Sequence, residues 1–238
     1  MSLQADLWVY LSASPLLWLT VTVGIWICAD HLSERLHRHP LANPVLISIV
    51  AVVLLLSALE VDYARFFQGA QFVHFALGPA TVALAVPFVR HWDHVRELWL
   101  PIVVSLTCGS LFAVISVVAL SELLGLPRDI LISFMPKSAT AGVAMAVSKD
   151  LGGNVSMTAV LVILTGIVGA IIVAPLMNGL GIKDYAARGF ALGLASHGIG
   201  TARAYSVSEL AGVFASVGMA LNAIATSMIV PLLAALLL

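Results

Sequence analysis

Two apolar stretches of this chain are each interrupted by glycine or proline, and each carries one basic residue. The first runs from Met135 to Gly142 and contains Lys137, and the second runs from Ala195 to Arg203. A charge inside an apolar membrane segment is unfavourable unless protein or water surrounds it. Lysine and the two-pronged guanidinium of arginine both bind carboxylates well. The two stretches therefore predict a buried site for a small anion, with Lys137 and Arg203 converging on one cavity.

Hydroxyl, glycine and proline residues beside these cations complete the predicted site. Hydroxyl groups can bond the remaining oxygens of the anion, and glycine or proline lets a helix open. The further candidate residues for substrate binding are Ser138, Thr140, Ser196, His197, Thr201, Gly78, Pro79, Thr81, Gly198 and Gly200.

Helix breaks matter in a membrane because the freed backbone groups need partners there. They are tolerated only where protein or a water-lined cavity satisfies them. Half-helix amino termini at such breaks aim N–H groups at anionic substrates in transporters. We predict discontinuous helices around Pro79, Pro136 and Gly198. These three interrupted segments alternate with three clean apolar ones, at 98–121, 151–182 and 210–238.

Three titratable residues are candidates for proton coupling. His197 lies within the second broken stretch, and the ordinary pKa of an imidazole is about 6.5. Glu60 and Asp62, which follow an apolar run, are next in line. The alternatives remain open, because His197 is equally well read as a hydrogen-bonded packing residue. Glu60 and Asp62 also fit a solvated turn.

The composition places the chain in a membrane. Hydrophobic residues make up 61% of it, charged residues 10%, and the mean hydropathy is +1.07. Soluble domains are about 45–50% apolar and about 25% charged. The net charge of -1 gives no basic patch, which excludes nucleic acid as a partner. Cys28 and Cys108 lie in apolar runs, where we expect packed thiols.

Neither catalysis nor a cofactor is expected. The cysteines and histidines lack the spacing of a metal site. No pair of nucleophile and base, nucleophile elbow or glycine-rich phosphate loop is evident. The sequence thus predicts a chain that binds or moves a ligand without transforming it.

Runs without formal charge predict the membrane segments. A helix needs about 20 apolar residues to cross the hydrocarbon. The runs are 7–29, 39–59, 66–89, 98–121, 138–148, 151–182, 189–202 and 210–238. Six are long enough alone, and the other two reach crossing length only when extended through Lys137 or Arg203. We therefore predict an all-α polytopic protein with seven or eight transmembrane segments, forming a single domain over residues 1–238.

Charged loops predict the orientation in part. The polar connections at 30–40 and 90–97 are rich in arginine, and loops of this kind lie preferentially in the cytoplasm. The amino terminus would then lie outside. After Arg128 the orientation depends on whether the broken segments cross fully or turn back, which the sequence leaves open.

Several motifs resemble those of the LrgB/CidB/YohK family of bacterial inner-membrane proteins. The similarity extends from about Asn43 to the carboxyl terminus. The string from His197 to Arg203, His-Gly-Ile-Gly-Thr-Ala-Arg, is long enough to be specific. The other motifs that carry the resemblance are residues 77–85, 136–138, 158–166 and 187–189.

The resemblance implies two functions of different classes. The family has been described as antiholin-like, regulating murein hydrolase activity and lysis with a smaller LrgA/CidA-like membrane partner. A similar plastid protein exchanges glycolate and glycerate, and bacterial relatives have been tied to pyruvate uptake. The two cationic breaks favour transport of small monocarboxylates, with antiholin-like regulation as the alternative. Because the fused LrgA-like half is lacking, a separate small membrane partner is expected; homo-oligomer formation is left open.

Overall fold

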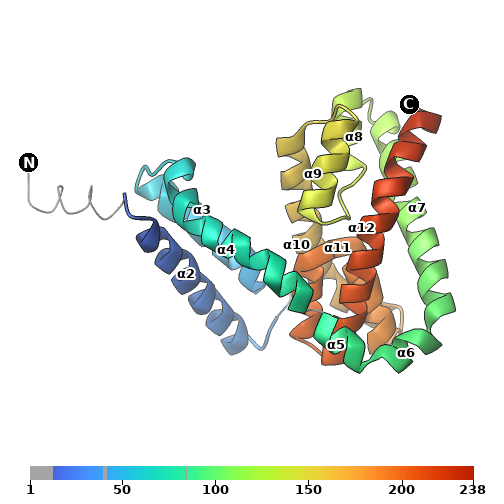
Figure 1. Cartoon of the computed structure of the whole chain (residues 1–238), viewed down its shortest axis with the longest axis horizontal. Coiled ribbons are helices and arrows are strands. Elements are labelled where there is room, and N and C mark those ends of the chain that lie inside the picture. The colour runs from blue at the N-terminus through green and yellow to red at the C-terminus, as the bar shows by residue number, and fades with distance from the viewer. Residues whose placement is uncertain (1–12, 40–41, 84) are drawn as a thin grey trace, which may run out of the picture. The chain divides into compact units, whose positions relative to one another are not determined.

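The computed structural model describes residues 13–39, 42–83 and 85–238, and every element of secondary structure in these ranges is a helix (Figure 1). The all-α prediction is confirmed. The chain divides into two compact units, Met1–Ala85 and Val86–Leu238, which are described separately below. A single domain over residues 1–238 stays a prediction.

Unit 1 contains three described helices, α2 (Pro15–Arg35), α3 (Pro44–Ala58) and α4 (Tyr63–Ala83). The side chain of Asn43 caps α3 by accepting a hydrogen bond from the backbone N–H of Val45 at 2.9 Å. Gly69 lets α4 approach α2, since a Cβ there would meet the backbone of α2 closer than 3.0 Å. Trp18 is buried beside this contact and meets Phe66 edge-on at 6.0 Å.

The predicted break around Pro79 is wrong, because α4 continues from Tyr63 to Ala83 with Pro79 inside it. A single proline removes one N–H and clashes with one preceding turn. Neighbouring turns can absorb that disturbance, and Gly78 does not unwind the helix here. The side chain of Thr81 lies outside the described part of the structure.

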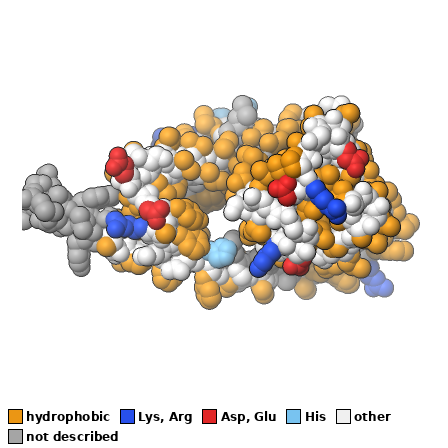
Figure 2. All heavy atoms as spheres, turned by 90° about the horizontal axis from the view of Figure 1, so that it is seen from above, with side chains coloured by type: hydrophobic (Ala, Val, Ile, Leu, Met, Phe, Trp, Pro, Cys, Tyr) orange, Lys and Arg blue, Asp and Glu red, His pale blue; other side chains and the backbone are white. Residues whose placement is uncertain are grey.

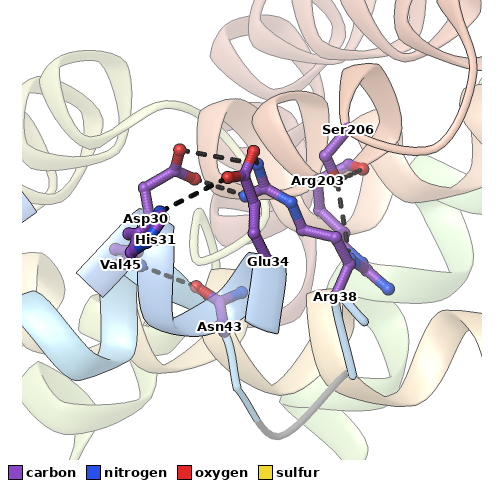
Figure 3. Close-up of polar contacts among 8 residues, drawn as sticks. All are labelled: Asp30, His31, Glu34, Arg38, Asn43, Val45, Arg203 and Ser206. Carbon is purple, nitrogen blue, oxygen red and sulfur yellow. Dashed lines mark hydrogen bonds and ion pairs between the residues drawn. The ribbon is translucent and has the colours of Figure 1, made fainter. Parts of the chain in front are cut away.

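The formally charged residues that the structure describes in unit 1 lie at or near helix ends. Arg38 pairs with Asp30 and Glu34 at the end of α2 (Figure 3), and its hydrogen bond to Asp30 raises the pKa of the guanidinium. Between α3 and α4, Glu60 is exposed, and Asp62 Oδ2 accepts the backbone N–H of Ala64 at 3.3 Å. Asp62 therefore acts as a helix cap, as the solvated-turn interpretation expects.

Unit 2 contains the other described helices, and only the first residue of α5 belongs to unit 1. They are α5 (Ala85–Arg90), α6 (Trp92–Glu97), α7 (Trp99–Leu123), α8 (Arg128–Phe134), α9 (Ala141–Asp150), α10 (Val155–Gly179), α11 (Tyr185–Tyr205) and α12 (Glu209–Leu237). Figure 1 shows α7, α10 and α12 as long rods, with α8 and α9 near the carboxyl terminus.

The segment α8–α9 is a hairpin, here called the first hairpin, whose tip is residues 135–140. The hydroxyl of Thr158 on α10 lies within hydrogen-bond distance of the backbone oxygen of Ser133, at 3.2 Å, and of Ser148 Oγ, at 2.7 Å. These two serines belong to different arms. A straight helix would separate them by about 22 Å, so the arms must lie side by side.

The helix α11 also folds back on itself and forms the second hairpin. Its backbone leaves the helical region at Ser196 and at His197, where φ is 42°. A Cβ on Gly200 would meet the backbone oxygen of Leu192 closer than 3.0 Å, and Leu192 packs with Ala204 in one cluster. The predicted breaks around Pro136 and Gly198 are therefore confirmed.

The two hairpins enter unit 2 from opposite ends. The first packs on the carboxyl-terminal parts of α7 and α12, in a cluster of Val114, Val117, Val118, Leu131, Met135, Val147, Val230 and Ala234. The second packs on their amino-terminal parts, in a cluster of Val95, Ile102, Ala186, Phe190, Leu194, Val213, Phe214 and Val217. A long helix followed by a hairpin thus occurs twice, in opposite directions.

Among the described residues, four helices are long and apolar enough to cross a membrane: α2, α7, α10 and α12. This is fewer than the seven or eight predicted segments: both broken segments turn back, α3 has only 15 residues, and α4 is not among the helices apolar enough to cross. Hydrophobic side chains predominate on the face drawn in Figure 2. Cys28 and Cys108 are exposed, so the packed-thiol prediction is wrong. Lipid tails solvate an apolar surface, which therefore need not be buried in protein.

Candidate functional site

The tips of the two hairpins meet at one buried amide. Asn222, halfway along α12, is 1% exposed. Its Nδ2 donates to the backbone oxygen of Ser138 at 3.1 Å and to that of Leu194 at 3.0 Å. These carbonyls belong to the two broken segments. One side chain thus satisfies backbone groups at both breaks and holds the tips together.

The side-chain oxygen of Asn222 also takes part in hydrogen bonds. It accepts a hydrogen bond from Ser110 Oγ on α7 at 2.7 Å and one from Thr226 Oγ1 at 3.5 Å. Sequence reasoning missed Asn222, although an uncharged amide in the middle of an apolar segment is a usable signal. Polar residues in such segments commonly bond across helices.

Lys137 lies at the tip of the first hairpin. It is half-buried, and its Nζ lies 3.5 Å from Ser138 Oγ. The adjacent Thr140 occupies the amino-terminal cap position of α9. The helix α9, with its positive dipole end, therefore begins four residues after Lys137. Two sources of positive potential meet at this tip.

The tip of the second hairpin packs on two glycines of α10. A Cβ on Gly166 would meet the ring of His197, and one on Gly169 would meet Ser196 Oγ, both closer than 3.0 Å. The ring bonds the backbone oxygen of Val162 through Nε2 at 2.8 Å. Because a carbonyl only accepts, Nε2 carries the hydrogen. Ser196 Oγ is buried and has no hydrogen-bond partner within the described chain.

Three further residues of the second hairpin were predicted to contribute to the substrate site: Thr201, Gly198 and Gly200. Thr201 donates to the backbone oxygen of His197 at 2.8 Å. Gly200 packs against the opposite arm beside Leu192, whereas Gly198 is exposed, and a Cβ added to it would lie 4.0 Å from Met219 Sδ. Gly200 is therefore required for the close approach of the two arms.

Arg203 lies in a cavity of about 250 Å³ that is formed by α10, α12 and both arms of the second hairpin. Arg188 lines the same cavity from the other arm, and Nη1 of Arg203 lies 3.4 Å from Ser206 Oγ (Figure 3). Ala211, near the start of α12, also contributes to the wall. The cavity thus lies toward the base of the hairpin.

The structure does not bring Lys137 and Arg203 into one cavity among the described residues. Lys137 is not part of the wall around Arg203. The tip of the first hairpin contacts α12 at Asn222, whereas the cavity contacts it at Ala211. Eleven residues of helix separate these positions by about 16 Å. Sequence spacing placed Arg203 in the broken segment, but could not show that the segment turns back and carries Arg203 away from the tip.

Helices long and apolar enough to span a bilayer, with paired hairpins between them, define an all-helical membrane protein. The sequence matches the model of the LrgB-like family over residues 22–236, so the chain belongs to that family and the resemblance stated above is confirmed.

Three curated relatives illustrate the similarity. The holin-like protein CidB of Staphylococcus epidermidis is 30% identical over 224 residues, which is 94% of this chain and 96% of the relative. The uncharacterized protein YxaC of Bacillus subtilis is 34% identical over 212 residues, covering 89% of this chain and 92% of the relative. CidB of Staphylococcus aureus is 29% identical over 218 residues, covering 92% and 95%. No solved structure matches the chain.

Proposed function

We propose that this protein carries small monocarboxylates, of the glycolate, glycerate or pyruvate type, across the bacterial inner membrane. The observation that carries the proposal is the meeting of two oppositely directed hairpin tips at Asn222. Discontinuous helices within repeats of opposite direction are a recurring way to build a transporter substrate site near the middle of the bilayer. α7 with the first hairpin and α10 with the second follow that plan.

The charge at the tips supports an anionic substrate. Lys137 supplies a formal positive charge, and the amino-terminal ends of α9 and of the second arm of α11 lie at the two tips. Ser138, Thr140 and the unpartnered Ser196 are the hydroxyl candidates for the other substrate oxygens. Thr201 is a weaker candidate, because it already donates to His197.

The names of the relatives favour a second candidate function. Two of them are called holin-like proteins, which fits an antiholin-like regulator of murein hydrolase activity and lysis. A small membrane partner of the LrgA/CidA type belongs to either proposal. The two differ in what they predict for purified protein: saturable uptake of one substrate, or leakage that does not depend on the solute.

Uptake into liposomes tests the transport proposal directly. Purified protein should take up radiolabelled pyruvate or glycolate with saturation, with and without an imposed proton gradient. Lys137→Met should reduce uptake at least tenfold, since a lost charge-assisted bond weakens binding by about 1.5–3 kcal/mol. The matched control is Lys149→Met, at an exposed lysine of α9. Equal uptake by the two variants would remove Lys137 from the site.

Replacement of His197 tests proton coupling. A His197→Gln variant keeps a donor for the backbone oxygen of Val162, which His197 bonds at 2.8 Å, but it cannot titrate. We expect it to bind and exchange substrate while losing accumulation driven by a proton gradient. Counterflow and gradient-driven uptake in the same liposomes measure the two properties. Accumulation equal to that of the parent would assign His197 to packing alone.

The hairpins also lead to a proposal for the orientation of unit 2. Because both turn back, the end where α7 begins carries Arg90, Arg96, Lys183, Arg188 and Arg203, and the other end carries Arg128 and Lys149. The positive-inside tendency then places the beginning of α7 in the cytoplasm.

Labelling of introduced cysteines checks this orientation. In a background with both native cysteines replaced by alanine, we expect Lys149→Cys to react with an impermeant maleimide on intact spheroplasts. Lys183→Cys should react only after permeabilisation. Both lysines are exposed, so accessibility to the reagent is matched. The reverse pattern would invert the assignment, and labelling of both positions from one side would contradict a full crossing by α10, which separates them.

A further inference from the structure

We infer that the cavity between the arms of the second hairpin is a separate binding site for small carboxylates, held by Arg188 and Arg203. The choice of ligand rests on the proposed function, but the site is defined by its own geometry. Arg203 lines the cavity from the second arm of α11 and Arg188 from the first. This site is distinct from the hairpin tips and from Lys137.

The lining of the cavity selects for an anion. Two guanidinium groups line it, and no carboxylate is present among its described lining residues. Tyr185 and Asn178 add polar atoms at the wall. Guanidinium groups bind carboxylates by paired, charge-assisted hydrogen bonds, which makes two of them on facing arms a suitable clamp.

Arg188 is already oriented by α10. Its Nη2 donates to the backbone oxygen of Ala174 at 3.3 Å and bonds Asn178 Oδ1, and these are the hydrogen bonds of this side chain among the described residues. The bonds fix the guanidinium against the carboxyl-terminal end of α10. The other two nitrogens of the Arg188 guanidinium, Nη1 and Nε, then remain as donors for a ligand in the cavity. Such pre-orientation reduces the entropy lost on binding.

The size and walls of the cavity favour a small organic anion. Its volume of about 250 Å³ is below the roughly 300–1,000 Å³ typical of pockets for drug-sized ligands. Val173, Leu192 and Val207 supply apolar wall for the carbon part of the ligand. A short-chain monocarboxylate such as pyruvate combines both requirements, whereas inorganic phosphate offers nothing to the apolar wall.

The position of the site gives it a role in the proposed transport. The cavity lies at the base of the second hairpin, about 16 Å along α12 from Asn222. It therefore lies on the side from which the second hairpin enters unit 2. A carboxylate held there is concentrated near that end before it reaches the tips.

Arginine modification tests the site without requiring transport. Purified full-length protein in detergent is treated with phenylglyoxal with or without pyruvate, and modification of each arginine is read by mass spectrometry. Pyruvate should slow modification of Arg188 and Arg203 and leave exposed Arg96 unchanged. It should do so equally in a Lys137→Met variant, because that residue belongs to the tips. Absence of protection, or equal protection by inorganic phosphate, would overturn the carboxylate site.

Equilibrium dialysis with radiolabelled pyruvate gives the affinity. In a Lys137→Met background, which removes the charge of the proposed tip site, Arg188→Gln and Arg203→Gln should each weaken binding about tenfold or more, and Arg96→Gln should leave it unchanged. Arg188→Lys, which keeps the charge near α10, controls for loss of folding and should bind with intermediate affinity. Protection of both arginines in protein that shows no uptake would uphold this site and reject transport. Uptake of pyruvate without protection of the two arginines would uphold transport and reject this site.

Discussion

Replacement of Gly193 by alanine is expected to destabilise unit 2 by about 3 kcal/mol, the upper part of the range for overpacking. Gly189 and Gly193 lie one turn apart on α11 and face the backbone of α12 at Ala211 and Ala215. A Cβ on Gly193 would meet the backbone oxygen of Ala215 closer than 3.0 Å. Backbone cannot move aside as a flexible side chain can, so the two helices would have to separate.

A thermal-unfolding measurement on purified protein in detergent checks this expectation. The midpoint of unfolding should fall by roughly 10 °C, using the usual relation for a chain of this length. Gly179→Ala is the matched control, because a Cβ at that helical position meets no atom within 4 Å. A Gly193→Ala protein as stable as the control would mean that α11 and α12 do not approach this closely.

Replacement of Asn222 by leucine is the second change with a large expected effect. Leucine has the same number and branching of side-chain heavy atoms, but it leaves the backbone oxygens of Ser138 and Leu194 without their donor and Ser110 without its acceptor. Each buried group left unsatisfied costs about 1–3 kcal/mol. We expect a loss of at least about 3 kcal/mol in stability, with both tips released from α12.

Hydrogen–deuterium exchange distinguishes local release from general unfolding. In Asn222→Leu, amides of residues 137–142 and 195–199 should exchange faster, while those in the middle of α7 and α10 should change less. Ser110→Ala is the comparison, since it removes one bond to the same oxygen and should cost about 1 kcal/mol. Unchanged exchange at both tips would show that Asn222 does not hold them.

The sequence predicted the helical class and two of the three breaks because both follow from local chemistry. Pro136 removes an N–H and is followed by short polar side chains, and Ser196 with His197 adopts a backbone that a helix cannot continue. Pro79 has the same local signal, yet α4 remains intact. A proline by itself therefore does not decide whether a helix opens, whereas Asn222 bonds one backbone oxygen in each of the two segments that do open.

The location of the site was harder to predict because it depends on chain direction beyond each break. Apolar runs give length, but the same run fits a crossing helix or a hairpin whose arms pack on each other. The close contact between Gly200 and Leu192 decides this for α11, and no pattern in the sequence pairs those residues. The separation of Lys137 from Arg203 follows from that fold-back. The partners of Asn222 lie on three other segments, and no sequence pattern pairs them with it.

The short arms of the first hairpin have an electrical consequence. With ten residues, α9 is about 15 Å long, half of the roughly 30 Å hydrocarbon thickness. In a protein oriented across a membrane, an anion that moves from one face to Lys137 would cross about half of the transmembrane voltage. Moving one charge through the full field corresponds to about 2.3 kcal/mol per 100 mV. The binding constant of the anion at the tips would then change roughly sevenfold per 100 mV. The voltage that strengthens binding from one face would weaken binding from the other.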